Sequence, residues 1–220
     1  MIIETEEAPA LESLPAFPLP TAVLFPGIVI PLHIDEPPDC ALLADALSGN
    51  RLLIVAMMQP GTETDTLPPL CTIAGAGQII HAEKLEAGDY NVLIQGLDRV
   101  RLLEELPQDL PYRRFKIEVI PRPDAEATEA ARDEIVLFES TVMRLAGLVA
   151  QTDAQLAEVM RSTADPIQLT DFLCATLVSD LTIQQELLAT VAFKERLQKL
   201  NELLADMLGR TGPADHSVLN

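Results

Sequence analysis

Residues 14–34, LPAFPLPTAVLFPGIVIPLHI, restrict the fold of this chain more than any other stretch. The segment is hydrophobic along most of its length, yet a proline interrupts it every few residues. Proline lacks the backbone N–H that a helix interior or a central strand requires. The segment therefore predicts several short strands with bends between them, as in a small barrel or a curled sheet. Its prolines are Pro15, Pro18, Pro20, Pro26 and Pro31.

The remaining residues up to 121 predict one helix and several strands. Pro37 and Pro38 suit the first turn of a helix and Gly49 suits its end, so we expect a helix at about 37–48. A hairpin turn is predicted at Glu86-Ala87-Gly88-Asp89. Apolar or alternating runs predict strands at 51–58, 78–85, 90–95, 99–103 and 112–120.

The pattern changes to helical periodicity after residue 121. One amphipathic stripe runs from Ile135 to Val149, and another runs along the last helix from Phe193 to Leu208. Asp153, Asp165-Pro166 and a capping box at Thr182-x-x-Gln185 predict the starts of helices between them. We predict an acidic flexible tail at 1–12, a β-rich subdomain at 13–121, a helical subdomain at 122–209 and a disordered tail at 210–220.

Charge and cysteine content limit the functions that the chain can have. The 220 residues carry a formal net charge of −19. Nucleic-acid and anionic-membrane binding both depend on Lys and Arg, so we expect neither partner. Cys40, Cys71 and Cys174 form no C-x-x-C pair, which favours reduced thiols in a cytoplasmic protein. The acidic N-terminus does not resemble a signal peptide, and no uninterrupted apolar run is long enough to span a membrane.

The chain offers no convincing catalytic or metal site. His33 follows an apolar strand without a nucleophile motif, and His81 with Glu83 supplies two metal ligands at most. We therefore predict no catalytic residues, no metal and no cofactor. Arg99 and Arg101 are expected to serve packing or to pair with local carboxylates. The basic residues Arg113, Arg114, Lys116 and Arg122 favour a plain strand face, with binding of acidic peptide or RNA as the alternative.

Two apolar features are candidates for contact with a polypeptide. Phe25-Pro26-Gly27 is predicted to be a turn that presents an exposed hydrophobic tip. Met57 and Met58 offer the pliable surface that methionine provides, although alternation turns one of them into the core. The candidate peptide-binding residues are Phe25, Pro26, Gly27, Met57, Met58 and Pro60.

Four segments in order resemble the N-terminal, substrate-binding domain of Lon proteases. They are LPAFPLPTAVLFPGIVIPLHI, YNVLIQGLDRVRL at 90–102, ADPIQLTDFLCATL and the final helix, so the resemblance covers about 14–208. It implies an α+β fold, with a PUA-like curled β-barrel of about six strands followed by a helical bundle with a long last helix. Full Lon proteases also carry a G-x-x-x-x-G-K-[ST] loop and a Ser–Lys dyad, and neither occurs here. We therefore expect a stand-alone, non-catalytic form of the domain.

The resemblance implies a protein- or peptide-binding module that engages unfolded or hydrophobic polypeptide segments in protein quality control. Two other functions stay open. The chain could be a structural adaptor or oligomerisation module that docks a protease or another partner protein through its terminal helix. It could also bind RNA by analogy with PUA folds, which is an argument from fold alone. A weak homo-oligomer is left open as well.

Overall fold

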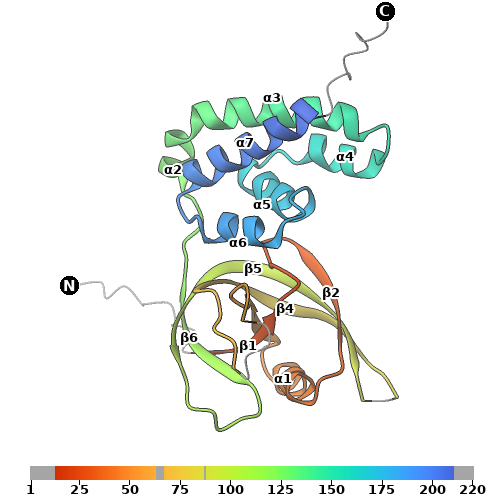
Figure 1. The fold of residues 1–220 in the computed structure, drawn as a ribbon, viewed down its shortest axis with the longest axis vertical. Helices are drawn as coiled ribbons and strands as arrows, with labels where there is room; N and C mark the ends of the chain where they lie inside the picture. The colour runs from red at the N-terminus through yellow and green to blue at the C-terminus, as the bar shows by residue number, and fades with distance from the viewer. Residues whose placement is uncertain (1–12, 63–66, 87, 211–220) are drawn as a thin grey trace, which may run out of the picture. The chain divides into compact units, whose positions relative to one another are not determined.

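The computed structural model describes residues 13–62, 67–86 and 88–210. These residues form one six-stranded sheet and seven helices, which is a mixed α+β fold (Figure 1). They divide into two compact units that are interleaved along the chain. The first contains the described residues up to Arg122 together with Asp171–Ala189, and the second contains Pro123–Thr170 and the residues from Thr190 onward. The predicted subdomains, in contrast, have a single boundary between residues 121 and 122, and their assignment stays a prediction.

The six strands belong to one sheet in the order β2-β5-β4-β3-β1-β6. β5 also pairs with β6, so the hydrogen-bonded ladder returns to β5 and joins five of the strands in a ring. β1 runs parallel to β3, and the other pairs are antiparallel. The PUA-like class of this sheet stays a prediction. The strands are β1 Leu14–Leu19, β2 Val29–Ile34, β3 Leu52–Met57, β4 Ile73–Lys84, β5 Tyr90–Glu105 and β6 Arg113–Val119.

The proline-rich opening segment forms two short strands, β1 and β2, with an irregular connection between them, as predicted. β2 lies at the edge of the sheet, where β5 is its only strand neighbour among the described residues. The N–H of Gly96 donates to the C=O of Ile28, so the even-numbered residues of β2 bond to β5. Pro31 therefore faces the open edge, where its missing N–H costs no ladder bond.

β4 and β5 are longer than predicted. β5 is one continuous strand where the sequence predicted separate strands at 90–95 and 99–103, and β4 begins at Ile73 rather than at 78. Gly75, Gly77 and Gly96 lie inside the ladder of β4 and β5, where Gly77 pairs with Gly96. A Cβ atom on Gly96 would overlap the carbonyl oxygen of Phe25, and one on Gly75 would overlap that of Leu24. Because these glycines have no side chain, the backbone of the segment before β2 can cross the sheet in direct contact with β4 and β5.

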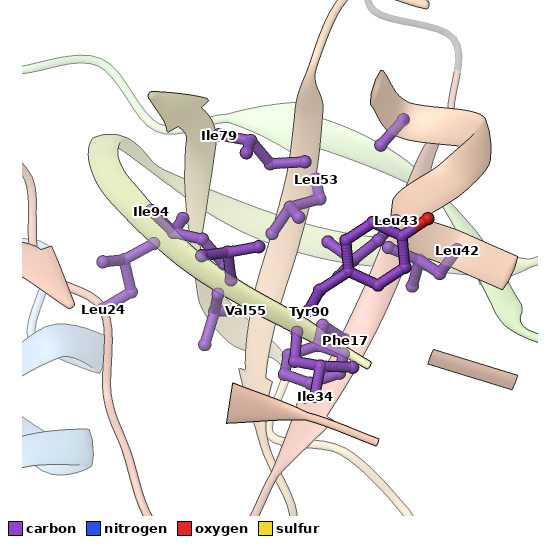
Figure 2. Packing of buried hydrophobic residues seen from close by; sticks show 12 residues of the cluster. Phe17, Leu24, Ile34, Leu42, Leu43, Leu53, Val55, Ile79, Tyr90 and Ile94 are labelled. Carbon is purple, nitrogen blue, oxygen red and sulfur yellow. The ribbon is translucent and has the colours of Figure 1, made fainter. Parts of the chain in front are cut away.

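Two clusters of buried hydrophobic residues hold the sheet unit together. Successive residues of β3 enter different clusters, because Leu53 and Val55 belong to one and Ile54 and Ala56 to the other. This explains why β3 is hydrophobic without alternation. Figure 2 shows the first cluster, in which side chains from several strands meet Leu42 and Leu43 of the helix α1. Its labelled members are Phe17, Leu24, Ile34, Leu42, Leu43, Leu53, Val55, Ile79, Tyr90 and Ile94.

The helices begin close to the predicted positions. α1, Pro37–Ser48, has the predicted bounds, and α6 packs against β4 in the first unit. In the second unit α3 packs against α4 and α7, through stripes that include Phe138, Val142, Leu197 and Leu200. None of the helices in the described ranges is both long and apolar enough to cross a membrane. The others are α2 Ala125–Ala130, α3 Arg132–Val149, α4 Ala154–Ser162, α5 Pro166–Thr176, α6 Leu181–Ala189 and α7 Phe193–Arg210.

Candidate functional site

Two of the predicted peptide-binding residues, Met57 and Pro60, line one hollow in the sheet unit. The hollow has a volume of about 500 Å³ and is lined by residues from the end of β3, the start of β4 and α6. We call it the α6 hollow. Its strand-side residues are Met57, Gln59, Pro60, Cys71, Thr72 and Ile73. Its helix-side residues are Thr182, Gln185, Glu186 and Ala189.

Backbone hydrogen bonds fix the strand side of the α6 hollow. The N–H of Cys71 donates to the C=O of Met57, and the N–H of Gln59 donates to the C=O of Pro69, both at 2.9 Å. Met58 and Leu70 form a β-bridge beside them. The chain leaving β3 and the chain entering β4 are thus held together, which gives the hollow a preformed wall.

A buried ion pair ties the segment containing α6 to the sheet. The guanidinium of Arg99 donates two hydrogen bonds to the carboxylate of Asp171, at 3.0 and 2.5 Å, and its Nε donates to the C=O of Leu188 at 3.2 Å. The side chains of Arg99 and Asp171 are only 7% and 3% exposed. The exposed side chain of Arg101 pairs with Glu118. Both arginines thus pair with carboxylates, which is one of the two roles expected for them, but the partner of Arg99 lies 72 positions away and is not local.

Gln185 is the most unusual side chain of the α6 hollow. Its Nε2 donates to the C=O of Ile73 at 2.8 Å, and the residue is 8% exposed. Its amide oxygen Oε1 is buried and has no hydrogen-bond partner in the part of the chain that the structure describes. Buried polar atoms nearly always have a partner in folded proteins. A residue that lines the hollow therefore carries a buried acceptor that no described group fills.

The sequence predicted a different role for Gln185, in a capping box with Thr182. The structure corrects this, because α6 is capped by Asp180, whose Oδ1 accepts hydrogen bonds from the N–H groups of Thr182 and Ile183. The side chain of Gln185 points instead to the sheet. Its contact with Ile73 spans 112 positions of the sequence, so no local pattern could have revealed it.

Met58, the next predicted residue, lines a different hollow near α1. This α1 hollow has a volume of about 510 Å³ and also contains Phe17, Tyr112 and several prolines. Three acids line it, namely Asp35, Glu36 and Asp39. Partial burial, together with the negative charges of Glu36 and Asp35, raises the pKa of Asp39 to about 6.

The raised pKa of Asp39 predicts a pH-dependent effect on stability. The folded state holds this proton more tightly than the unfolded state, so ionisation between about pH 4 and pH 6 lowers the free energy of unfolding. We expect Asp39→Asn to raise the urea midpoint at about pH 7.5 and to change it little at about pH 4, where both proteins are neutral at this position. Equal changes in the midpoint at both pH values would contradict the prediction.

The predicted tip at Phe25-Pro26-Gly27 lines neither hollow. Phe25 is fully buried, and the guanidinium of Arg99 lies 5.8 Å from the centre of its ring. Pro26 is half-buried and Gly27 is exposed, in a turn where Gly27 has a φ of 78°. The predicted exposed tip would have left the ring of Phe25 accessible. Because the ring is buried beneath the turn, we leave Phe25 out of the candidate surface.

The basic residues of β6 and of the segment after it are all paired with acids. Arg113 makes two hydrogen bonds of 2.7 Å with Glu105, and the other three cations each contact one carboxylate. These pairs reduce the positive charge that a phosphate or an acidic peptide would meet, which favours the predicted plain strand face. The other three pairs are Arg114–Asp109, Lys116–Glu104 and Arg122–Asp98.

His33 and His81 come from neighbouring parts of the sheet unit, and Nε2 of His33 lies 3.9 Å from Oδ2 of Asp89. His33 and His81 line one shallow hollow, and Nδ1 of His33 lies 2.9 Å from Oδ1 of Asn91. The described residues contain no group of three or more His, Cys, Asp or Glu side chains that could hold a metal ion. The prediction that the chain binds no metal or cofactor stays a prediction.

Comparison with known proteins identifies the family. The model of the ATP-dependent protease La (LON) substrate-binding domain matches residues 13–206, and the chain belongs to this family. The chain is 30% identical over 204 residues to the Lon protease of Dictyoglomus thermophilum and 27% identical over 205 residues to that of Anaeromyxobacter dehalogenans. These alignments cover 91% and 93% of the chain but only 25% and 24% of the two relatives. The chain thus spans about a quarter of their length.

The N-terminal domain of a Mycobacterium avium complex Lon protease has the same fold. It superimposes with a TM-score of 0.70 at 18% sequence identity, and the alignment covers 88% of this chain and 98% of that domain. The predicted resemblance to the Lon substrate-binding domain is therefore confirmed. The family match is to the substrate-binding domain of Lon, which is the part of these proteases that the chain resembles.

Proposed function

We propose that the chain is a non-catalytic module that binds unfolded or hydrophobic polypeptide segments in cytoplasmic protein quality control, built on a PUA-like curled β-barrel. Membership of the Lon substrate-binding domain family supports the polypeptide as ligand. The α6 hollow is the observation that carries the proposal, because it combines apolar walls with a buried acceptor. Ligand sites in proteins typically have this composition.

Burial of an apolar side chain in the α6 hollow explains binding better than the addition of a strand to the sheet. An added strand would need the outward-facing backbone groups of β2, but Pro31 supplies no N–H there. The α6 hollow, in contrast, presents Met57, Pro60 and Ile73 beside backbone that hydrogen bonds hold in place. A preformed site lowers the entropic cost of binding.

The affinity for a single segment should be weak. Ordering a flexible chain offsets much of the gain from burying its side chains. We therefore expect a Kd on the order of tens of micromolar for a permanently unfolded, carboxymethylated model protein, measured by fluorescence anisotropy. An anisotropy that stays flat up to high micromolar concentration contradicts the proposed function.

The natural cysteines report where the polypeptide binds. Cys71 lines the α6 hollow, whereas Cys40 is half-buried elsewhere and lines none of the hollows described above. Burial raises the pKa of the Cys71 thiol, so alkylation is best followed above about pH 8.5. We expect the unfolded protein to slow alkylation of Cys71 and to leave Cys40 unchanged. Equal protection of both thiols would argue against binding in the α6 hollow.

A pair of matched substitutions separates the site from the rest of the surface. Thr72→Trp places a large ring at an exposed position of the α6 hollow and should weaken binding of the unfolded protein by about tenfold. Thr176→Trp makes the same change at an exposed position of α5 that does not line the hollow, and it should bind as the natural protein does. Equal affinities of the two variants would place the site elsewhere.

The adaptor function has one observation in its favour, although on a different helix from the one predicted. The apolar stripe of α7 is largely buried within the chain, since Phe193, Leu197, Leu200 and Leu204 are at most 3% exposed. In α3, by contrast, Val136, Leu137 and Met143 are 62%, 56% and 58% exposed. If the chain docks a partner protein through α3, Met143→Lys should abolish capture of that partner and leave the binding of unfolded protein unchanged.

A further inference from the structure

The amide of Gln185 is held in one orientation by the sheet. Its Nε2 donates to the C=O of Ile73 at 2.8 Å, in surroundings where the residue is 8% exposed. Rotation of the amide by half a turn would break this bond and set two oxygens against each other. The orientation therefore leaves Oε1 as a fixed acceptor, and this oxygen has no partner within the described ranges.

A buried acceptor of this kind favours a ligand that donates a hydrogen bond and carries apolar surface beside the donor. An extended polypeptide meets both requirements, because every residue except proline offers a main-chain N–H next to its side chain. The apolar walls at Met57, Pro60 and Ile73 suit the side chain. The oxygen Oε1 of Gln185 can accept a hydrogen bond from the main-chain N–H. This bond removes the free-energy cost of leaving a buried acceptor without a partner.

The negative charge of the chain limits which polypeptide segments can bind. Among the described residues that line the α6 hollow, Glu186 is the only charged one, and it is acidic. The whole chain carries a formal charge of −19, so a second copy of it would be repelled. A neutral or basic segment would meet no such repulsion.

We propose that Oε1 of Gln185 accepts a hydrogen bond from a main-chain N–H of an extended, apolar polypeptide segment with neutral or basic flanks, while one of its side chains enters the α6 hollow. This inference rests on the proposed function and names its substrate class. In this inference Gln185 recognises the peptide backbone, and the apolar wall of the hollow receives an apolar side chain.

The test uses a short, capped, fluorescent peptide with a central leucine between valines and with lysine flanks, together with a series in which each main-chain amide in turn is N-methylated. We expect one position of the series to weaken binding to the natural protein by about tenfold, the effect of one lost hydrogen bond. Gln185→Met should bind the parent peptide about tenfold more weakly and should show no further loss at that position. A version with glutamate flanks should bind more weakly than the lysine version, and added salt should reduce the difference.

Gln184→Met is the matched control for folding. Gln184 is equally buried, and its Nε2 donates to the C=O of Val178 at 2.6 Å, but it does not line the α6 hollow. This variant should keep the full effect of N-methylation. The inference is wrong if the peptide binds but no N-methyl position weakens its binding to the natural protein. It is also wrong if N-methylation weakens binding to Gln185→Met as much as to the natural protein. If neither the peptide nor the unfolded model protein binds, the proposed function fails with it.

Discussion

Gly96→Ala is expected to lower the free energy of unfolding by about 3 kcal/mol or more, because the new methyl group has no space. Its Cβ would overlap the carbonyl oxygen of Phe25, which is backbone and cannot swing away as a side-chain end can. Gly75→Ala should have a similar effect through the carbonyl oxygen of Leu24. Urea unfolding followed by circular dichroism measures both changes, and loss of soluble folded protein is the extreme form of the same result.

Gly147→Ala is the matched control for these substitutions. Gly147 is exposed in α3, and a Cβ there would meet nothing within 4 Å. Because alanine is favoured over glycine inside a helix, this variant should be more stable by about 1 kcal/mol. If Gly96→Ala unfolds at the same urea concentration as the natural protein, the backbone at Phe25 does not lie against Gly96 as described.

The second large effect is expected at the buried ion pair. Arg99→Met or Asp171→Leu alone should lower the free energy of unfolding by about 3–5 kcal/mol, because each leaves a buried charge without its partner. The double variant should be much more stable than the sum of the two losses predicts, since two apolar side chains of similar size can replace a buried pair at little cost. A thermodynamic cycle from urea unfolding at low and high salt measures the coupling.

The exposed pair of Arg101 and Glu118 serves as the comparison. Their side chains are 43% and 59% exposed, so Arg101→Met should cost less than about 1 kcal/mol and its effect should shrink with salt. A cost at Arg99 no larger than the cost at Arg101 would show that the tie between the sheet and the segment 171–189 contributes little to stability.

Local signals were sufficient for much of the fold. The prolines of the opening segment predicted short strands with bends, and Pro37 with Gly49 predicted the bounds of α1. The helical stripes of α3 and α7 could be read from spacing, since their buried residues recur every three or four positions. Each of these features depends on residues near one another in the sequence, where steric limits and periodicity act directly.

Features that depend on distant residues were missed. Gly75, Gly77 and Gly96 lie outside the predicted strands, yet they belong to β4 and β5, and the backbone of another segment passes over Gly75 and Gly96. The partner of Arg99 lies 72 positions away, and the contact of Gln185 spans 112. Of the predicted site residues, Met57 and Pro60 were placed together by the structure, while burial of Phe25 followed from a crossing that no local pattern indicates.

The interleaved division of the chain has a consequence for synthesis on the ribosome. Strands β1 to β6 emerge first, but Asp171, Gln185 and Leu188, which contact them, emerge only after α2, α3 and α4. Until then the nascent sheet lacks the carboxylate that pairs with Arg99 and the amide that donates to Ile73, so it should stay exposed to chaperones and proteases until residues 171–189 emerge. The sheet and α6 should therefore complete their folding together, and a ribosome stalled before residue 171 should display a sheet that lacks these contacts.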